Sequence, residues 1–299
     1  GGARGWPGAC RSRSCHGPDD ERTDRAQRDP DVHGPPPGGW VPPPHGEDWF
    51  LHFQQSGAHG RLVHLQPMRW GTDGWPVLGD GGAPVRVHRK PDLPEQPPSR
   101  PAVDDTFPGG RFGRQWQWTA NPDEGWATQH TGDGLRLGCV RTERLDDLRS
   151  VPHVLTQRLP ARACAVEVAL RLDGEASGAR AGLVVLGDAY AWIGLERAPD
   201  GTVRLTHRFA PAGADRERDA ARSRPVAGDR VLLRIEVTAD ARCRFSYVSD
   251  GAGEPVPLGP EFAATPWRWV GALLGLFAGA PESSGHAGTA VFSDFRVTP

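Results

Sequence analysis

The sequence predicts an all-β protein made of two parts that a proline-rich linker joins. Three observations support this class. Short apolar runs alternate with polar residues at the period of two that a half-buried strand requires. Glycine and proline, 39 and 30 of the 299 residues, supply frequent turns between these runs. No segment carries a sustained apolar stripe at the helical period of 3.6 residues.

The first part spans residues 1–90. Residues 1–48 carry two proline triplets, which neither a strand nor a helix accommodates, so we expect no regular structure there. Ordered strands begin with WFLHFQ (49–54) and RLVHLQPMRW (61–70), which alternate on either side of a turn. The segment DGWPVLGDGG (73–82) then predicts a turn, a strand and another turn.

Residues 91–103 contain five prolines and no periodicity, the composition of a semi-rigid linker. The second part spans residues 104–299. Its short strands follow one another at the spacing typical of a β-sandwich. The clearest are residues 163–172, 181–187, 189–196, 230–238, 243–248 and 289–297.

Two further segments of the second part need separate interpretation. The apolar run 269–280 is about a dozen residues long, too short for the roughly 20 that a membrane span requires, and it indicates a buried strand. Residues 212–224 are compatible with a helix or with an exposed charged loop.

Composition excludes several classes of partner. The net charge is −2 and no block of like charges occurs, so neither a nucleic acid nor an acidic membrane has an electrostatic footprint. Five scattered cysteines argue against a disulfide scaffold and slightly favour a reducing, cytoplasmic compartment. A signal peptide is neither indicated nor excluded, because the chain does not begin with Met.

The chain shows no strong catalytic or metal-binding motif. Cys10, Cys15 and His16 fit no common zinc spacing, and no nucleophile elbow is present, so we predict neither a metal site nor a serine hydrolase. The adjacent carboxylates at 47–48 and 104–105 point to opposite faces of an extended chain and do not form an acid–base pair by themselves.

Eleven tryptophans against two tyrosines are a more informative signal, because indole faces fill cores and also support sugar rings. Most tryptophans in the second part lie in or beside predicted strands, and we assign these to the core: Trp116, Trp118, Trp192, Trp267 and Trp269. Trp40 lies in a Gly-Gly-Trp loop and is a candidate for binding sugar.

Several ordered strings resemble glycoside hydrolase family 43, the β-xylosidase and α-L-arabinofuranosidase family. The first part resembles its last propeller blade through GPPPGGWV (34–41), GEDWFLHFQ (46–54), GRLVHLQPMRW (60–70) and DGWPVLG (73–79). The second part resembles the concanavalin-A-like sandwich of its two-domain members through DDTF (104–107), RQWQWTANP (114–122), RFSYVSDG (244–251), VGALLGLF (270–277) and FSDFRV (292–297).

The resemblance implies a partial five-bladed β-propeller at residues 1–90 and a jelly-roll sandwich at residues 104–299. It also implies inverting hydrolysis of xylo- or arabino-oligosaccharides, with the catalytic carboxylates on earlier blades and none of them in this chain. Arg61 matches the family's active-site arginine, whose planar fork of donors suits sugar hydroxyls. Pro36 stands where the family usually has a histidine, in GPPPG instead of GPHQG.

The resemblance leaves three questions open. It decides neither between xylose and arabinose as the sugar nor the oligomeric state. It implies no cofactor, and it leaves open whether the sandwich binds calcium. The substrate-binding residues that we predict are Arg61 and Trp40, and the predicted partner is an oligosaccharide. The alternative function is a non-catalytic carbohydrate-binding or structural sandwich.

Overall fold

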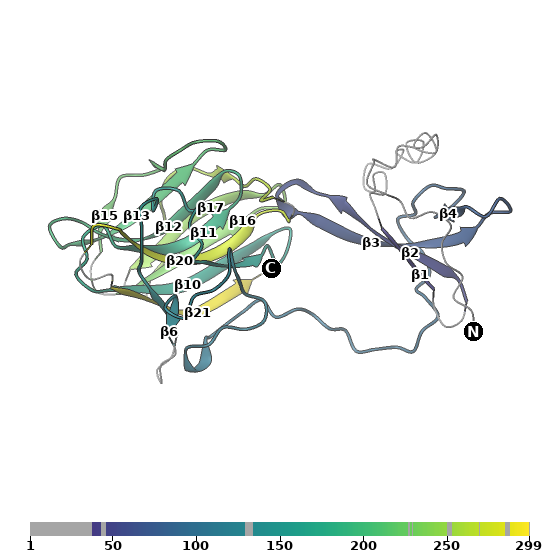
Figure 1. Ribbon diagram of the computed structural model, residues 1–299, viewed down its shortest axis with the longest axis horizontal. Helices are drawn as coiled ribbons and strands as arrows, with labels where there is room; N and C mark the ends of the chain where they lie inside the picture. Colours follow the sequence, from purple (N-terminus) through teal and green to yellow (C-terminus); the bar gives the residue numbers. More distant parts are fainter. Residues whose placement is uncertain are drawn as a thin grey trace. The chain divides into compact units, whose positions relative to one another are not determined.

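The computed structural model describes residues 38–42, 46–128, 134–226, 228, 230–249, 253–268, 270–284 and 288–298 (Figure 1). The predicted all-β class is confirmed. The described residues contain two single-turn 3₁₀ helices, Gly57–His59 and Pro108–Gly110, and no α-helix. Within this described part of the chain, no helix is long and apolar enough to cross a membrane.

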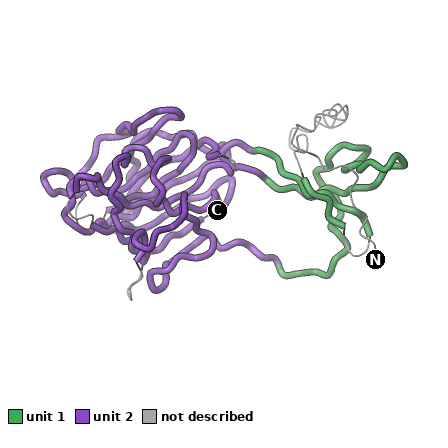
Figure 2. Tube along the Cα trace, viewed as in Figure 1, with its two compact units in different colours: residues 1–55, 62–97 green, residues 56–61, 98–299 purple. Residues whose placement is uncertain are grey.

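The chain divides into two compact units, which Figure 2 colours separately. The N-terminal unit comprises residues 1–55 and 62–97, and the sandwich unit comprises residues 56–61 and 98–299. The division between 97 and 98 falls within the proline-rich segment, which forms no strand. Residues 56–61 are therefore part of the sandwich unit, although they connect two strands of the N-terminal unit.

The N-terminal unit is a four-stranded sheet in the order β1-β2-β3-β4. Its strands are β1 (Gly39–Val41), β2 (Asp48–Gln55), β3 (Arg61–Trp70) and β4 (Pro76–Leu78). Gln66 is buried and exchanges two hydrogen bonds with the backbone of Val85, at 2.7 and 3.0 Å. Many large apolar side chains stay exposed, namely Trp40, Leu51, Val63, Leu65, Trp70 and Trp75. The unit therefore has only a small core of its own.

The expectation of no regular structure before residue 48 is wrong at β1. Gly39 pairs with Leu51 and Val41 with Trp49, so β1 is an edge strand of the sheet. The strand forms because Pro42 follows it and does not interrupt it, and an edge strand needs hydrogen bonds on one side only. Residues 1–37 and 43–45, including Cys10, Cys15, His16 and Pro36, lie outside the described residues.

The sandwich unit consists of two packed sheets. The first has the order β18-β17-β16-β10-β21-β7-β6, with β19 beside β17, and the second has the order β14-β13-β12-β11-β20-β9-β5, with β15 beside β13 and β8 beside β20. The strands of the first sheet are β6 (Ala127–Thr128), β7 (Leu135–Gly138), β10 (Cys164–Asp173), β16 (Val231–Val237), β17 (Arg242–Ser249), β18 (Val256–Pro257), β19 (Phe262–Ala263) and β21 (Thr289–Thr298). Those of the second are β5 (Gln117–Trp118), β8 (Val140–Thr142), β9 (Val154–Arg158), β11 (Arg180–Leu186), β12 (Tyr190–Arg197), β13 (Val203–Ala210), β14 (Arg218–Asp219), β15 (Arg224–Pro225) and β20 (Leu273–Pro281).

The two sheets differ in how their faces are covered. In β16 every second residue is buried and faces the core between the sheets, which is the alternation that a half-buried strand requires. In β11 every residue is buried, because the second sheet is covered on both faces. Leu183 and Val185 face the core between the sheets, whereas Val184 and Leu186 belong to a second apolar cluster. Its members are Leu148, Val151, Val154, Val184, Leu186, Tyr190, Trp192, Ala210, Leu273 and Phe277.

The six strands that the sequence marks most clearly in the second part all form, within two residues at each end. The predicted buried strand at 269–280 begins only at Leu273, because Gly271 has a φ of +82° and ends a turn before it. Residues 212–224 contain no helix; they form a loop with the short strand β14, and β15 begins at their last residue. The alternative of an exposed charged loop is wrong at Glu217, whose side chain is only 2% exposed.

Two buried histidines make the sandwich sensitive to acid. Burial lowers the pKa of both His153 and His207 to about 4, although a hydrogen bond from His207 Nδ1 to the Leu258 carbonyl opposes the shift. Because the folded pKa lies below the unfolded value of about 6.5, the unfolded chain binds more protons between these values, and stability falls as the pH drops from 6.5 towards 4.

We therefore expect each of these histidines to contribute a loss of about 2 kcal/mol in the free energy of unfolding between pH 7 and pH 5. Denaturant titrations at several pH values measure it. His207→Phe should flatten the pH dependence whatever its effect on absolute stability. An unchanged slope in that variant would show that His207 is not responsible.

Candidate functional site

The hairpin tip, defined as residues 56–61, connects β2 to β3 and carries Arg61 at its end. The backbone of Ser56 donates to the Gly60 carbonyl at 2.7 Å, and that of Gly60 donates to the Gly57 carbonyl at 3.0 Å. These bonds close a compact single turn, in which Gly57 and Gly60 take positive φ angles. The tip therefore has a defined backbone conformation immediately before Arg61.

Within the sandwich unit, the hairpin tip packs against the segment that precedes β20. Ala272 donates its backbone N–H to the Ala58 carbonyl at 2.7 Å, and Ala58 is buried in the core between the sheets. His59 Nε2 lies 3.1 Å from the Ala239 carbonyl, to which it donates in the Nε2–H tautomer. The tip is thus held by two different loops of the sandwich unit.

The structure places the two predicted substrate-binding residues in different units. Arg61 is the half-buried first residue of β3 and belongs to the sandwich unit. Trp40 belongs to the N-terminal unit and lies on β1, not in a loop. Its indole Nε1 donates to Asp48 Oδ1 at 2.8 Å, and its ring meets Trp70 edge-on at 5.4 Å. Trp40 keeps 42% of its surface exposed, so a face remains for an apolar ligand.

A tight turn at residues 267–271 contacts the hairpin tip. Trp267 donates its N–H to the Gly271 carbonyl at 2.9 Å, and Val270 donates to the Trp267 carbonyl at 3.0 Å. The Arg268 guanidinium lies over the Trp267 ring at 4.6 Å. The core assignment holds for Trp116 and Trp192, which are buried. Trp118 and Trp267 are half-buried and pack against the apolar clusters, and Trp269 lies outside the described residues.

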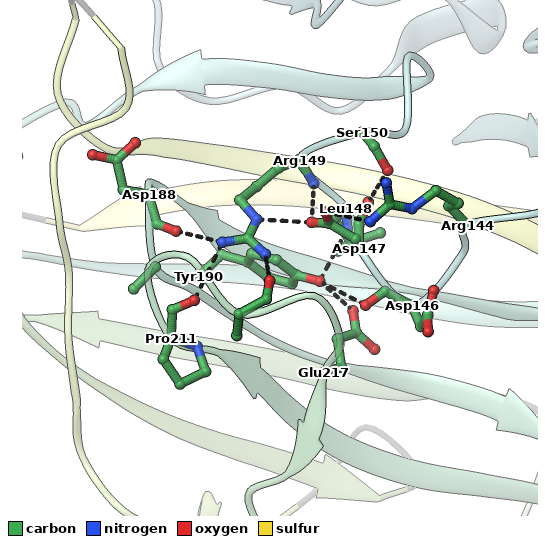
Figure 3. Close-up of polar contacts among 12 residues, drawn as sticks. Arg144, Asp146, Asp147, Leu148, Arg149, Ser150, Asp188, Tyr190, Pro211 and Glu217 are labelled. Atoms are coloured by element: carbon green, nitrogen blue, oxygen red, sulfur yellow. Dashed lines mark hydrogen bonds and ion pairs between the residues drawn. The ribbon is translucent and has the colours of Figure 1, made fainter.

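A polar network organised by Arg149 connects three loops of the sandwich unit (Figure 3). Its guanidinium donates to Asp147 Oδ1 at 2.7 Å and to the carbonyls of Asp188 and Pro211, at 2.8 and 3.2 Å. It also donates to the Ala214 carbonyl and lies over the Tyr190 ring at 5.4 Å. One planar fork of donors thereby fixes the loops at 144–151, 187–189 and 211–217.

Glu217 is the centre of the buried part of this network. It pairs with Arg180 at 2.8 Å and accepts hydrogen bonds from the Tyr190 hydroxyl at 2.8 Å and from the Trp192 indole at 2.9 Å. Burial and the Glu217 charge raise the pKa of Tyr190, which keeps that hydroxyl protonated as a donor. The Glu217 carboxylate is thus engaged by groups of the protein itself, so Glu217 is a structural anchor and not a free acid.

Composition gives no sign of this anchor, because Glu217 lies in a loop between four other charged residues, two before it and two after it. The sequence does contain one local signal. Tyr190 and Trp192 lie on one face of an otherwise apolar strand. A buried hydroxyl and a buried indole N–H both need a hydrogen-bond acceptor, so this strand predicts a buried acceptor nearby.

A shallow groove of about 760 Å³ lies beside the network. It is lined by Thr142, Glu143, Leu145, Asp146, Gly178, Arg180, Glu196, Arg216, Pro281, Glu282 and Ser283. Its lining holds four carboxylates and two guanidinium groups and no aromatic ring. No group of three or more His, Cys, Asp or Glu side chains in the described part of the chain is arranged to hold a metal ion.

Comparison with known proteins identifies the fold family. Residues 104–298 match the family model described as the beta xylosidase C-terminal concanavalin A-like domain. The chain belongs to glycoside hydrolase family 43. A curated protein of Xylanibacter ruminicola, described as a "Putative beta-xylosidase", is 31% identical over 281 residues, covering 91% of this chain and 50% of the relative.

Two other family 43 proteins extend the comparison. The non-reducing end α-L-arabinofuranosidase BoGH43B of Bacteroides ovatus is 32% identical over 79 residues, 26% of this chain and 15% of that protein. The crystal structure of a xylan beta-1,4-xylosidase from Bacillus halodurans has a TM-score of 0.75 at 23% identity, covering 88% of this chain and 53% of that one, and shows the shared fold. This family 43 chain thus spans about half the length of the first of these curated relatives.

Proposed function

We propose that this chain is the C-terminal portion of an inverting glycosidase that removes xylose or arabinose units from oligosaccharides. The observation that carries the proposal is Arg61, the residue that matches the family's active-site arginine, at the end of a hairpin tip that the sandwich unit holds. Xylosidase and arabinofuranosidase are the activities named for the curated relatives.

In this proposal the catalytic carboxylates lie outside the present residues. Inverting hydrolysis needs one carboxylic acid to protonate the leaving oxygen and one carboxylate to activate water on the opposite side of the sugar. Three carboxylates buried in the described part of the chain are committed elsewhere: Asp105 accepts three hydrogen bonds, Asp147 is paired with Arg149, and Glu217 is paired with Arg180. Because these carboxylates bind groups of the protein itself, they support a binding role for this chain and not a catalytic one.

Arg61 then contributes binding and orientation. A guanidinium presents several N–H donors in one plane and can hold two sugar hydroxyls, or a hydroxyl and a neighbouring carboxylate, at the same time. Trp267 lies on the turn that contacts the same hairpin tip and offers a partly exposed apolar ring.

The proposal is tested by comparing two proteins on aryl xylosides and aryl arabinofuranosides. The 299-residue chain should show no turnover, whereas the natural polypeptide extended at its N-terminus to the length of the relatives should hydrolyse at least one of them. Arg61→Ala in the extended protein should lower kcat/KM by roughly 10- to 150-fold, the loss of charge-assisted hydrogen bonds worth about 1.5–3 kcal/mol.

Arg61→Lys is the matched control for that variant. A lysine keeps the charge but not the planar fork, so it should restore only a small part of the activity. An Arg61→Ala enzyme with unchanged efficiency and a lower melting temperature would show a structural arginine. Turnover by the 299-residue chain, abolished by replacing one of its own carboxylates, would place the catalytic acids here and refute the proposal. Binding of oligosaccharide without turnover by the extended protein would favour the non-catalytic alternative.

A further inference from the structure

The hairpin tip and the turn at 267–271 meet backbone to backbone, through two glycines. A Cβ atom placed on Gly60 would lie 2.3 Å from the carbonyl oxygen of Val270, and one placed on Gly271 would lie 2.4 Å from the backbone nitrogen of Gly60. Contacts this short to backbone atoms leave no space for any side chain. Both glycines also have positive φ angles, +79° and +82°, which other residues rarely adopt.

This contact, which we call the glycine clamp, is reinforced by the bond from Ala272 to Ala58 described above. The 267–271 turn is itself fixed to the sandwich unit. Asp188 donates its N–H to the Pro266 carbonyl at 2.9 Å, and Ala189 donates to Thr265 Oγ1 at 2.8 Å. Val270 and Trp267 pack on the second apolar cluster. The clamp therefore connects the hairpin tip to the rigid part of the sandwich.

Arg61 directly follows the clamp. On the side of β3 that carries Arg61, the next side chains of the strand are exposed. Alternation along β3 places Arg61, Val63 and Leu65 on one side, and the last two are 67% and 42% exposed. Gly60, one residue before Arg61, restrains its backbone.

We propose that the glycine clamp is a positioning device for Arg61: the sandwich unit, through Gly60 and Gly271, sets the place from which this arginine reaches the sugar. The inference rests on the proposed function for the role of Arg61. It gives the turn before β20 a part in substrate binding that acts through the backbone of the hairpin tip. A positioning error of about 1 Å can cost a large factor in rate, because the donors no longer meet the hydroxyls.

The first experiment tests the clamp in the 299-residue chain and does not depend on activity. Gly271→Ala introduces the clashing Cβ, and Gly201→Ala is its matched control. Gly201 has the same φ of +82° and lies in the same unit, but a Cβ added to it would meet no atom within 4 Å, so it carries the backbone strain without the clash. Hydrogen exchange by NMR then follows the Ala272 amide.

We expect this amide to exchange about tenfold faster, or more, in Gly271→Ala than in Gly201→Ala, while the amides of β10 and β16 exchange alike in the two variants. Equal exchange at Ala272 in both variants would overturn the clamp. If β10 and β16 also lose protection in Gly271→Ala alone, the glycine supports the whole sandwich and the positioning role is refuted.

The second experiment is a double-mutant cycle in the N-terminally extended protein, with kcat/KM on the aryl glycosides as the readout. Gly271→Ala should lower kcat/KM by about tenfold in the presence of Arg61 and have almost no effect in the Arg61→Ala background, because it acts through that residue. Gly201→Ala should leave kcat/KM unchanged in both backgrounds.

Equal losses from Gly271→Ala with and without Arg61 would refute the positioning role, because the effect would not pass through the arginine. An inactive extended protein would refute the proposed function and the positioning role with it. In that case the exchange experiment still reports whether the clamp holds the hairpin tip, so the two failures are distinguishable.

Discussion

Replacing Glu217 with alanine lowers the free energy of unfolding by about 3–5 kcal/mol, the usual cost of removing one partner of a buried ion pair. The side chains of Arg180 and Glu217 are 4% and 2% exposed, so the variant leaves a buried guanidinium without its carboxylate. The Tyr190 hydroxyl and the Trp192 indole lose the same acceptor. Denaturant unfolding of the 299-residue chain, followed by tryptophan fluorescence, measures the loss.

Two further variants separate the charge from the packing. Glu217→Gln keeps an amide oxygen for Tyr190 and Trp192 but removes the charge that Arg180 requires, so its loss should lie between those of the wild type and the alanine variant. The double variant Arg180→Met/Glu217→Leu removes both charges and should recover the part of the loss that comes from the unpaired guanidinium, because an apolar replacement of a buried pair is often close to neutral. The Tyr190 hydroxyl and the Trp192 indole still lack their acceptor in this variant. A Glu217→Ala protein within about 1 kcal/mol of the wild type would show that water reaches Arg180.

Replacing Asp105 with alanine destabilises the sandwich unit by a comparable amount, about 3–5 kcal/mol, because it leaves several hydrogen-bond donors without an acceptor. The carboxylate accepts from the backbone of Phe107 and Gly113, both at 2.8 Å, and from the Trp116 indole at 3.0 Å. Trp116 is buried against Phe107 and Phe295, so no water replaces the lost acceptor at the indole.

Asp104→Ala is the matched control at the next position. The Asp104 carboxylate accepts one hydrogen bond, from the Val297 backbone at 2.6 Å, and the residue is exposed, so the change should cost no more than about 1 kcal/mol. Equal losses for the two variants in thermal unfolding would mean that local chain conformation, and not the buried carboxylate, accounts for the effect at Asp105.

The sequence by itself determined the class of the fold and the clearest strands of the sandwich. Alternation over Val231–Val237 is a property of neighbouring residues, and it predicts a half-buried strand without knowledge of what lies opposite. The same holds for the proline-rich segment 91–103, whose composition prevents pairing wherever it lies. The order of the short sequence motifs along the chain was also enough to identify the family. Each motif is weak alone, but several of them in the family's order are specific.

Only the tertiary structure decided the roles of Glu217 and of the hairpin tip. A glutamate in a charged loop becomes a buried anchor because Arg180, Tyr190 and Trp192, between 25 and 37 positions away, converge on it. Gly60 and Gly271 meet although 211 positions separate them, so no local pattern marks their contact. Periodicity reports which face of a strand is apolar, whereas burial of a charge and close approach of two backbones depend on which distant segments fold against that face.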